Sequence, residues 1–167
     1  MDGTICLWNT GATAEKLCRP GYFLGLEGDK ALLPVLRPLL SEDANARNMA
    51  RGGFYYDTGL YLDNDAEIYI LSAAIGIPQV REKNLWLDRN FPVPYRNRIY
   101  CACGENKAYA AAQHLGQDID GSWCLLDDYS PNLCCWAESG GRAVKYINGI
   151  NGSGKVWKGE RLELSKR

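Results

Sequence analysis

Carboxylates at two distant places in the sequence could serve one reaction. Asp2 opens the segment Asp2–Thr4, whose glycine favours a tight turn, while Asp127 and Asp128 follow a run of apolar residues. Mg²⁺ prefers oxygen ligands, and proteins usually hold it with one or two carboxylates together with substrate phosphate and water. Residues of these types at a turn and at a strand end therefore indicate a Mg²⁺-dependent phosphoryl-transfer site.

The second half of the chain should place these residues on a parallel α/β sheet, because apolar runs alternate there with helical stretches. The sequence predicts strands over 66–72, 98–103, 122–127 and 143–147. It predicts helices over 80–87, 105–115 and 130–139, with Ser130 as N-cap and Pro131 at the first helical position of the last one. Ligands of such a sheet bind beyond the carboxyl ends of its strands.

The first half of the chain is less regular. A helix is expected over 29–40, interrupted by two prolines, and residues 51–64 are expected to form a loop or a small hairpin. The Arg-Gly-Gly and aromatic residues of 51–64 could bind single-stranded nucleic acid by stacking, although a packed surface insertion is the better interpretation. Residues 148–167 are expected to form a solvated segment pinned by Trp157.

The amino-acid composition and net charge indicate which classes of protein and of partner fit this chain. The 167 residues suit a single domain, 46% of them are apolar and 23% charged, and the net charge is -1. This balance favours neither a nucleic-acid nor a membrane partner, and we see no transmembrane run and no signal peptide. Seven cysteines, an odd number, indicate reduced thiols in a cytoplasmic protein. A zinc site is a weaker alternative, because neither the pair at 101 and 103 nor the pair at 134 and 135 has the usual ligand spacing.

The order of the polar motifs resembles that of the haloacid dehalogenase-like (HAD) phosphatases. Asp2–Thr4 is similar to the end of their first motif, D-x-D-G-T, and Ser72 is similar to the hydroxyl residue of the second. Lys107 is similar to the lysine of the third motif. The pair Asp127 and Asp128, with Asn132 shortly after it, resembles the acidic fourth motif.

Further segments narrow the resemblance to the bacterial and phage 5'-nucleotidase branch, which is related to the 5'(3')-deoxyribonucleotidases. These segments are 19–23, 71–73, 82–87, 126–133 and 145–151. The resemblance implies a three-layer, Rossmannoid α/β domain with a mostly parallel sheet and a small cap at residues 5–28. Trp8, Tyr22 and Phe23 would then be candidates to stack on a nucleobase, and core packing is an equally good role for each.

The resemblance also implies roles in phosphomonoester hydrolysis. Asp2 would be the general acid and base, with its main-chain carbonyl facing Mg²⁺. Ser72 and Lys107 would position the phosphoryl group, with Thr4 and Ala73 beside it as further substrate contacts. Asp127 and Asp128 would hold or orient the metal. The substrate would be a (deoxy)nucleoside monophosphate.

The nucleophile of the family is the first aspartate of D-x-D-G-T, which would stand two residues before Asp2 and outside residues 1–167. The apolar strand that carries it is central in the family's sheet. We therefore expect residues 1–167 alone to lack turnover and to leave two strand edges unpaired. Two alternatives stay open: a HAD phosphatase of another small phosphorylated metabolite, and a non-catalytic protein that binds phosphate or nucleotide.

Overall fold

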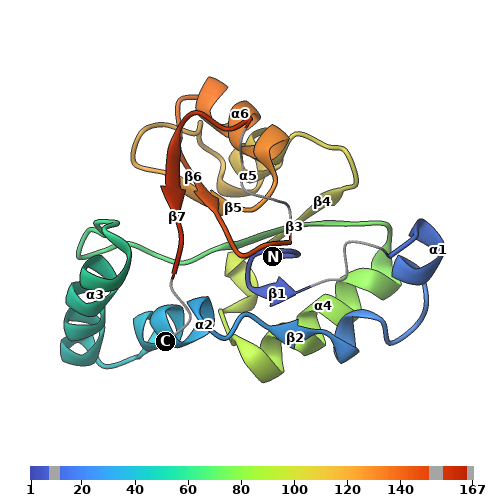
Figure 1. The fold of residues 1–167 in the computed structure, drawn as a ribbon, viewed down its shortest axis with the longest axis horizontal. Coiled ribbons are helices and arrows are strands. Elements are labelled where there is room, and N and C mark those ends of the chain that lie inside the picture. The colour runs from blue at the N-terminus through green and yellow to red at the C-terminus, as the bar shows by residue number, and fades with distance from the viewer. Residues whose placement is uncertain (8–11, 151–155, 165–167) are drawn as a thin grey trace.

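Strands and helices alternate from residue 70 onward in the computed structural model, which describes residues 1–7, 12–150 and 156–164 (Figure 1). The strands are β1 (Cys6–Leu7), β2 (Glu27–Gly28), β3 (Ile70–Ala74), β4 (Arg98–Ala102), β5 (Cys124–Asp127), β6 (Arg142–Tyr146) and β7 (Glu160–Leu162). The α-helices are α1 (Ala14–Leu17), α2 (Leu32–Leu36), α3 (Ala44–Thr58), α4 (Ile77–Asn90), α5 (Lys107–Leu115) and α6 (Ser130–Glu138). Short 3₁₀ turns are η1 (Phe23–Gly25), η2 (Arg37–Leu40) and η3 (Tyr95–Asn97). The fold is therefore mixed α/β, as the alternating pattern predicts.

The main strands form two separate parallel sheets. β3 pairs with β4 over five residues, whereas β5, β6 and β7 form a three-stranded sheet in that order. The short strands β1 and β2 pair antiparallel and close the base of the insertion between them. No pairing joins β3 to β5 in the part of the chain that the structure describes. Each of these two strands consequently has one edge without a neighbouring strand in the described ranges.

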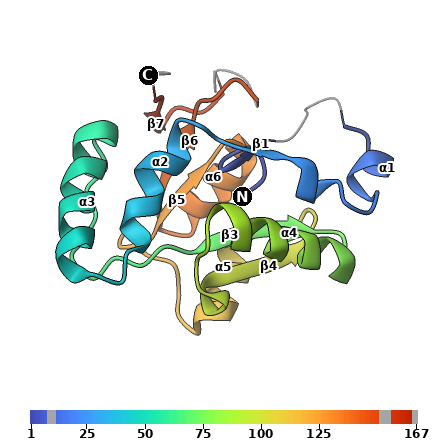
Figure 2. The same cartoon turned by 90° about the horizontal axis from the view of Figure 1, so that it is seen from below.

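Helices cover the strands on two sides. α5 and α6 lie on one side, and α2, α3 and α4 lie on the other (Figures 1 and 2). Each side has its own apolar core, one built around Trp86, Leu87 and Phe91 and the other around Leu133 and Trp136. Helices α4, α5 and α6 pack against strands, whereas α2 and α3 pack against each other and against η2.

Most predicted elements occur with shifted ends. The predicted strand over 66–72 is β3 at Ile70–Ala74, because only these residues have a pairing partner in β4. The helix predicted over 29–40 is broken into α2 and η2, as its prolines suggest. Helix α4 extends well beyond the predicted 80–87 at both of its ends.

The prediction of a loop or hairpin over 51–64 is wrong for residues 51–58, whereas residues 59–64 form a loop. Residues 51–58 are the second half of α3. The Asp43 carboxylate accepts hydrogen bonds from the main-chain N–H groups of Asn45 and Ala46, and Gly59 ends the helix with a φ of 71°. Signals at both ends of the helix therefore outweigh the cost of its internal glycine pair.

Two further local predictions need correction. Tyr129, and not Ser130, is the N-cap of α6, because Tyr129 has an extended backbone with φ -108° and ψ 111° and Ser130 is already the first helical residue. The segment from residue 148 is not merely a solvated tail, since β7 adds a strand beside β6 and Leu162 is buried. Trp157 is also buried and donates its indole N–H to the carbonyl of Glu160. None of the helices in the described ranges has the length and apolar character needed to cross a bilayer.

Candidate functional site

Asp2, Ser72 and Lys83 form a cluster where α4 packs on β3. Lys83 Nζ donates to Asp2 Oδ2 at 2.6 Å and to Ser72 Oγ at 3.0 Å, and it also donates to the main-chain carbonyl of Ala73. Lys83 is fully buried. Burial of an ammonium is costly unless it is paired and hydrogen-bonded, and three acceptors match its three protons. The cluster therefore holds a charged lysine beside a carboxylate and a hydroxyl.

A second cluster surrounds Asp127 at the end of β5. Asp127 Oδ2 lies 2.7 Å from Lys107 Nζ and accepts a hydrogen bond from Asn132 Nδ2 at 3.2 Å, while its Oδ1 accepts one from the main-chain N–H of Tyr129. Burial raises the pKa of Asp127, but the positive charges of Lys107 and the Met1 amino group more than offset it, so that the pKa is lowered. Asp127 is consequently a buried, ionised carboxylate.

Asp128 touches the Asp-Gly-Thr turn. Thr4 Oγ1 donates to Asp128 Oδ1 at 3.3 Å. A Cβ atom added to Gly3 would lie 2.0 Å from Asp128 Oδ2, and Gly3 has a φ of +78°. Both the space and the backbone conformation thus require glycine at position 3. Asp128 is also held through its main-chain carbonyl, which accepts a hydrogen bond from Lys145 Nζ at 2.6 Å.

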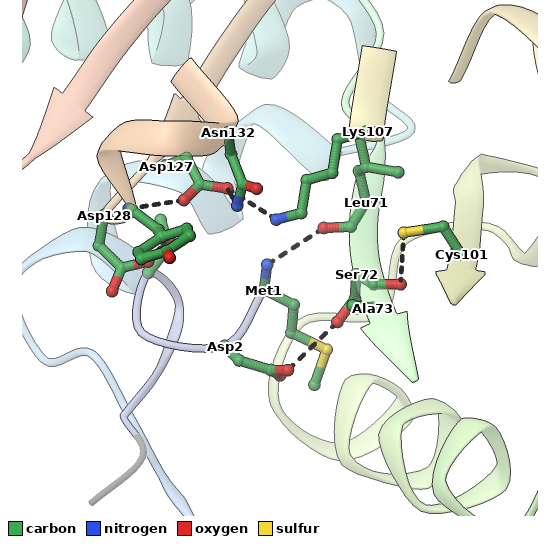
Figure 3. A network of polar contacts seen from close by, with 12 residues as sticks. Met1, Asp2, Leu71, Ser72, Ala73, Cys101, Lys107, Asp127, Asp128 and Asn132 are labelled. Carbon is green, nitrogen blue, oxygen red and sulfur yellow. Dashed lines mark hydrogen bonds and ion pairs between the residues drawn. The ribbon is translucent and has the colours of Figure 1, made fainter. Parts of the chain in front are cut away.

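The Met1 amino group lies between the two clusters (Figure 3). It is buried and donates to the main-chain carbonyl of Leu71 at 3.3 Å. Burial lowers the pKa of this amino group, and the charge of Lys107 lowers it further. The segment Met1–Thr4 therefore contacts β3 through Met1 and Leu71 and contacts Asp128 through Thr4.

The structure gathers the predicted polar residues, but it divides them between two lysines. Asp2 and Ser72 face Lys83, whereas Asp127 faces Lys107. Of the residues expected beside the substrate, Thr4 contacts Asp128 and Ala73 contributes its carbonyl to Lys83. The arrangement alternates positive and negative groups, which suits a ligand that carries anionic oxygens, a cation, or both.

The insertion between β1 and β2 reaches this site through Phe23. The Phe23 ring is buried, lies 4.5 Å from Lys83 Nζ and makes an edge contact with Tyr22. The Glu82 carboxylate accepts hydrogen bonds from the main-chain N–H groups of Gly21 and Phe23, which fixes the insertion on α4. Phe23 therefore packs against the lysine. Trp8, the third aromatic candidate, lies outside the described residues.

Asp2 carries an oxygen atom that could hold magnesium. Oδ1 of Asp2 is buried and has no hydrogen-bond partner within the described residues, so it fits a cation ligand. Both oxygens of Asp127, by contrast, accept hydrogen bonds from protein groups. No cluster of three or more His, Cys, Asp or Glu side chains that could hold a metal occurs in the described ranges. A magnesium ion here would thus need main-chain oxygens, water or a bound phosphate as further ligands.

Lys83 is a candidate site residue that the sequence interpretation missed. It stands three residues after Val80 and four before Leu87, so it occupies the apolar stripe of α4. A lysine at that spacing signals a buried charge that needs a partner. The motif order assigns the lysine of the third motif to Lys107 instead, because Lys107 precedes Asp127 and Asp128 in the sequence.

No family model, curated protein or solved structure matches this chain. The resemblance to HAD phosphatases consequently rests on the motifs and their order.

Proposed function

We propose that residues 1–167 carry the site of a Mg²⁺-dependent phosphomonoester hydrolase of 5'-nucleotidase type, on a three-layer HAD-like domain with a small cap. One observation supports this most: the Lys83 ammonium is buried between Asp2 and the Ser72 hydroxyl. An ammonium and a hydroxyl held together in the interior suit the oxygens of a phosphoryl group.

Each residue has a role in this proposal. Ser72 donates to a phosphoryl oxygen, and Lys83 and Lys107 offset the charge that gathers there. Asp2 donates a proton to the leaving oxygen and then accepts a proton from the attacking water. Magnesium, when bound by Asp2 and attracted by the charges of Asp127 and Asp128, would supply further charge neutralisation.

The proposal places the attacking carboxylate two residues before Asp2. Asp2 itself is held by Lys83 through Oδ2, and in-line attack requires a nucleophile within about 3–3.5 Å of phosphorus. Residues 1–167 alone should therefore bind phosphate without turnover. A nucleotide is the proposed substrate because Tyr22 brings a half-buried aromatic ring to the insertion, whereas the Phe23 ring is buried against Lys83. Another small phosphomonoester would use the same polar groups.

The decisive experiment adds five apolar residues followed by an aspartate to the N-terminus. The aspartate directly precedes Met1 and so occupies the nucleophile position. We expect Mg²⁺-dependent phosphate release from the extended protein and none from residues 1–167. The matched control carries asparagine in place of the added aspartate and should be inactive. Robust Mg²⁺-dependent turnover by purified residues 1–167 would show that the nucleophile has been assigned wrongly.

A further inference from the structure

We infer that the outward face of α3 is an interface through which two copies of this chain associate as a weak, reversible dimer. Helix α3 lies at one end of the molecule, where it packs on α2 and η2 (Figures 1 and 2). Its outward face consists of six exposed residues, which are Asn45, Ala46, Met49, Gly52, Gly53 and Tyr56. This surface is separate from the candidate phosphate site.

The outward face combines exposure with apolar character. Helical spacing places Met49 and Tyr56 two turns apart on one line, on the side opposite to Phe54. Phe54 is buried in the core, whereas Met49 is 80% exposed and Tyr56 is 85% exposed. A helix surface that faces solvent usually carries charged residues, and large apolar side chains exposed together are typical of an interaction site. The outward face of α3 therefore has the character of an interface.

The charged residues of α3 lie away from this face. Arg47 donates to the main-chain carbonyl of Ser41 at 2.6 Å, and Arg51 donates to Asn48 Oδ1 at 2.8 Å. Asp57, the remaining charged residue of the described helix, is half-buried like both arginines. The outward face is consequently neutral, so a nucleic acid or a charged peptide would find no opposite charge on it. A second copy of the same neutral face is the better match.

The glycine pair in α3 is not required by the packing of the chain itself. Gly52 and Gly53 have negative φ angles, and nothing in the described chain beyond the adjoining helix backbone lies within 4 Å of a Cβ atom added to either. Glycine in the middle of a helix is destabilising relative to alanine. The pair does, however, lower the helix surface between Met49 and Tyr56. A second helix could therefore approach the backbone closely at this point.

The outward face is complementary to itself about a two-fold axis. If the axis passes between Gly52 and Gly53, two antiparallel helices place Met49 of one copy opposite Tyr56 of the other. The contact of a methionine sulfur with an aromatic ring is favourable, and the symmetry forms it twice. A crossing angle of about 50°, the commonest class of helix packing, would confine the contact to this centre and separate the helix ends.

The area of the face predicts a weak dimer. An aromatic side chain can bury about 150–250 Å², so Tyr56, Met49 and their small neighbours would bury roughly 500 Å² per copy. Two copies reach about 1,000 Å², which is the lower limit for a specific interface, whereas interfaces of standard size bury about 1,200–2,000 Å². We therefore expect a dissociation constant in the micromolar range or above, with exchange between monomer and dimer.

Sedimentation velocity of residues 1–167 between about 1 µM and about 300 µM tests the dimer. The weight-average sedimentation coefficient should rise with concentration from the value of a monomer toward that of a dimer. The double variant Gly52→Ala and Gly53→Ala should weaken dimerisation by about tenfold or more, because its methyl groups hold the two backbones apart. The same variant should raise the thermal unfolding midpoint of the dilute monomer, since alanine favours the helix.

Two further measurements locate the interface. Tyr56→Lys places a charge on the neutral face and should abolish dimerisation, whereas Tyr109→Lys at an exposed position of α5 should not. Replacement of Tyr56 by photoreactive p-benzoylphenylalanine should give a cross-link to the peptide that contains Met49. Mixing isotope-labelled and unlabelled copies identifies this cross-link as one between two chains.

A chain that stays monomeric at every concentration overturns the inference, even if an unrelated protein or a nucleic acid binds α3. A dimer that neither the alanine pair nor Tyr56→Lys weakens also overturns it, because such a dimer uses another face. A cross-link between chains that avoids the Met49 peptide would overturn the antiparallel arrangement.

Discussion

Lys83 Nζ lies 2.6 Å from Asp2 Oδ2, so an ion pair joins the buried face of α4 to the Asp-Gly-Thr turn. The two residues are 81 positions apart in the sequence. Lys83 is almost completely inaccessible, whereas 28% of the Asp2 side chain stays exposed. One partner of the pair is therefore anchored in the core, and the other can still meet a ligand.

Lys83→Met should destabilise the fold strongly. The substitution leaves Asp2 and Ser72 without their shared donor, and loss of one member of a buried ion pair costs about 3–5 kcal/mol. Because Asp2 is partly exposed, we expect about 3 kcal/mol, measured as the change in unfolding free energy in urea. Lys30→Met is the matched control, since the Lys30–Glu27 pair is exposed on both sides and should contribute less than about 1 kcal/mol. Equal losses for both variants would contradict the structural role of Lys83.

Magnesium affinity should depend on the acidic pair. In the extended protein, a double variant with Asn at positions 127 and 128 should lose Mg²⁺ binding in calorimetry, because the carboxylate charge that attracts the ion is gone. The double variant with Asn at positions 63 and 65 changes net charge equally at exposed sites. It should bind Mg²⁺ like the parent. Unchanged affinity after substitution at 127 and 128 would reject their role in holding or orienting the metal.

Substrate preference should favour nucleotides. Stacking of a base on an aromatic ring contributes about 1–3 kcal/mol, and Tyr22 in the insertion is half-buried with its ring near Phe23. The extended protein should hydrolyse nucleoside 5'-monophosphates, including deoxy forms, faster than sugar phosphates or p-nitrophenyl phosphate. Tyr22→Ala should reduce this preference while leaving p-nitrophenyl phosphate turnover unchanged. A preference for sugar phosphates by about tenfold would reject the nucleotidase assignment but keep the phosphatase.

The Arg98–Asp88 pair should make stability depend on acid pH. The hydrogen bond from Arg98 holds the pKa of Asp88 below its ordinary value of 3.8. A carboxyl group with a lowered pKa in the folded state stabilises the fold fully above about pH 4, and this stabilisation is lost as pH falls through the folded-state pKa. We expect Asp88→Asn to cost about 1 kcal/mol near neutral pH, since the pair is partly exposed. The difference should shrink as the pH falls below about 4. If the stability difference between the parent protein and Asp88→Asn does not change with pH, the charge of Asp88 is not its cause.

Local sequence patterns were sufficient for the elements of the second half. Turn residues and apolar runs predict β4, α5 and β5 to within a few residues, because their signals are local. The same reasoning failed for residues 51–58, where the glycine pair suggested a break although Asp43 and Gly59 supply the helix ends. β7 was also missed, because its three residues are stabilised only by pairing with β6.

The order of the motifs and the predicted strand ends indicate that Asp2, Ser72, Asp127 and Asp128 approach one another. How these residues pair depends on contacts in the folded chain. Spacing along the chain could not reveal that Lys83 turns inward to Asp2, since that choice depends on the packing of α4 against β3 and Phe23. The partner of a buried charge is set by contacts between distant segments, which no local pattern encodes.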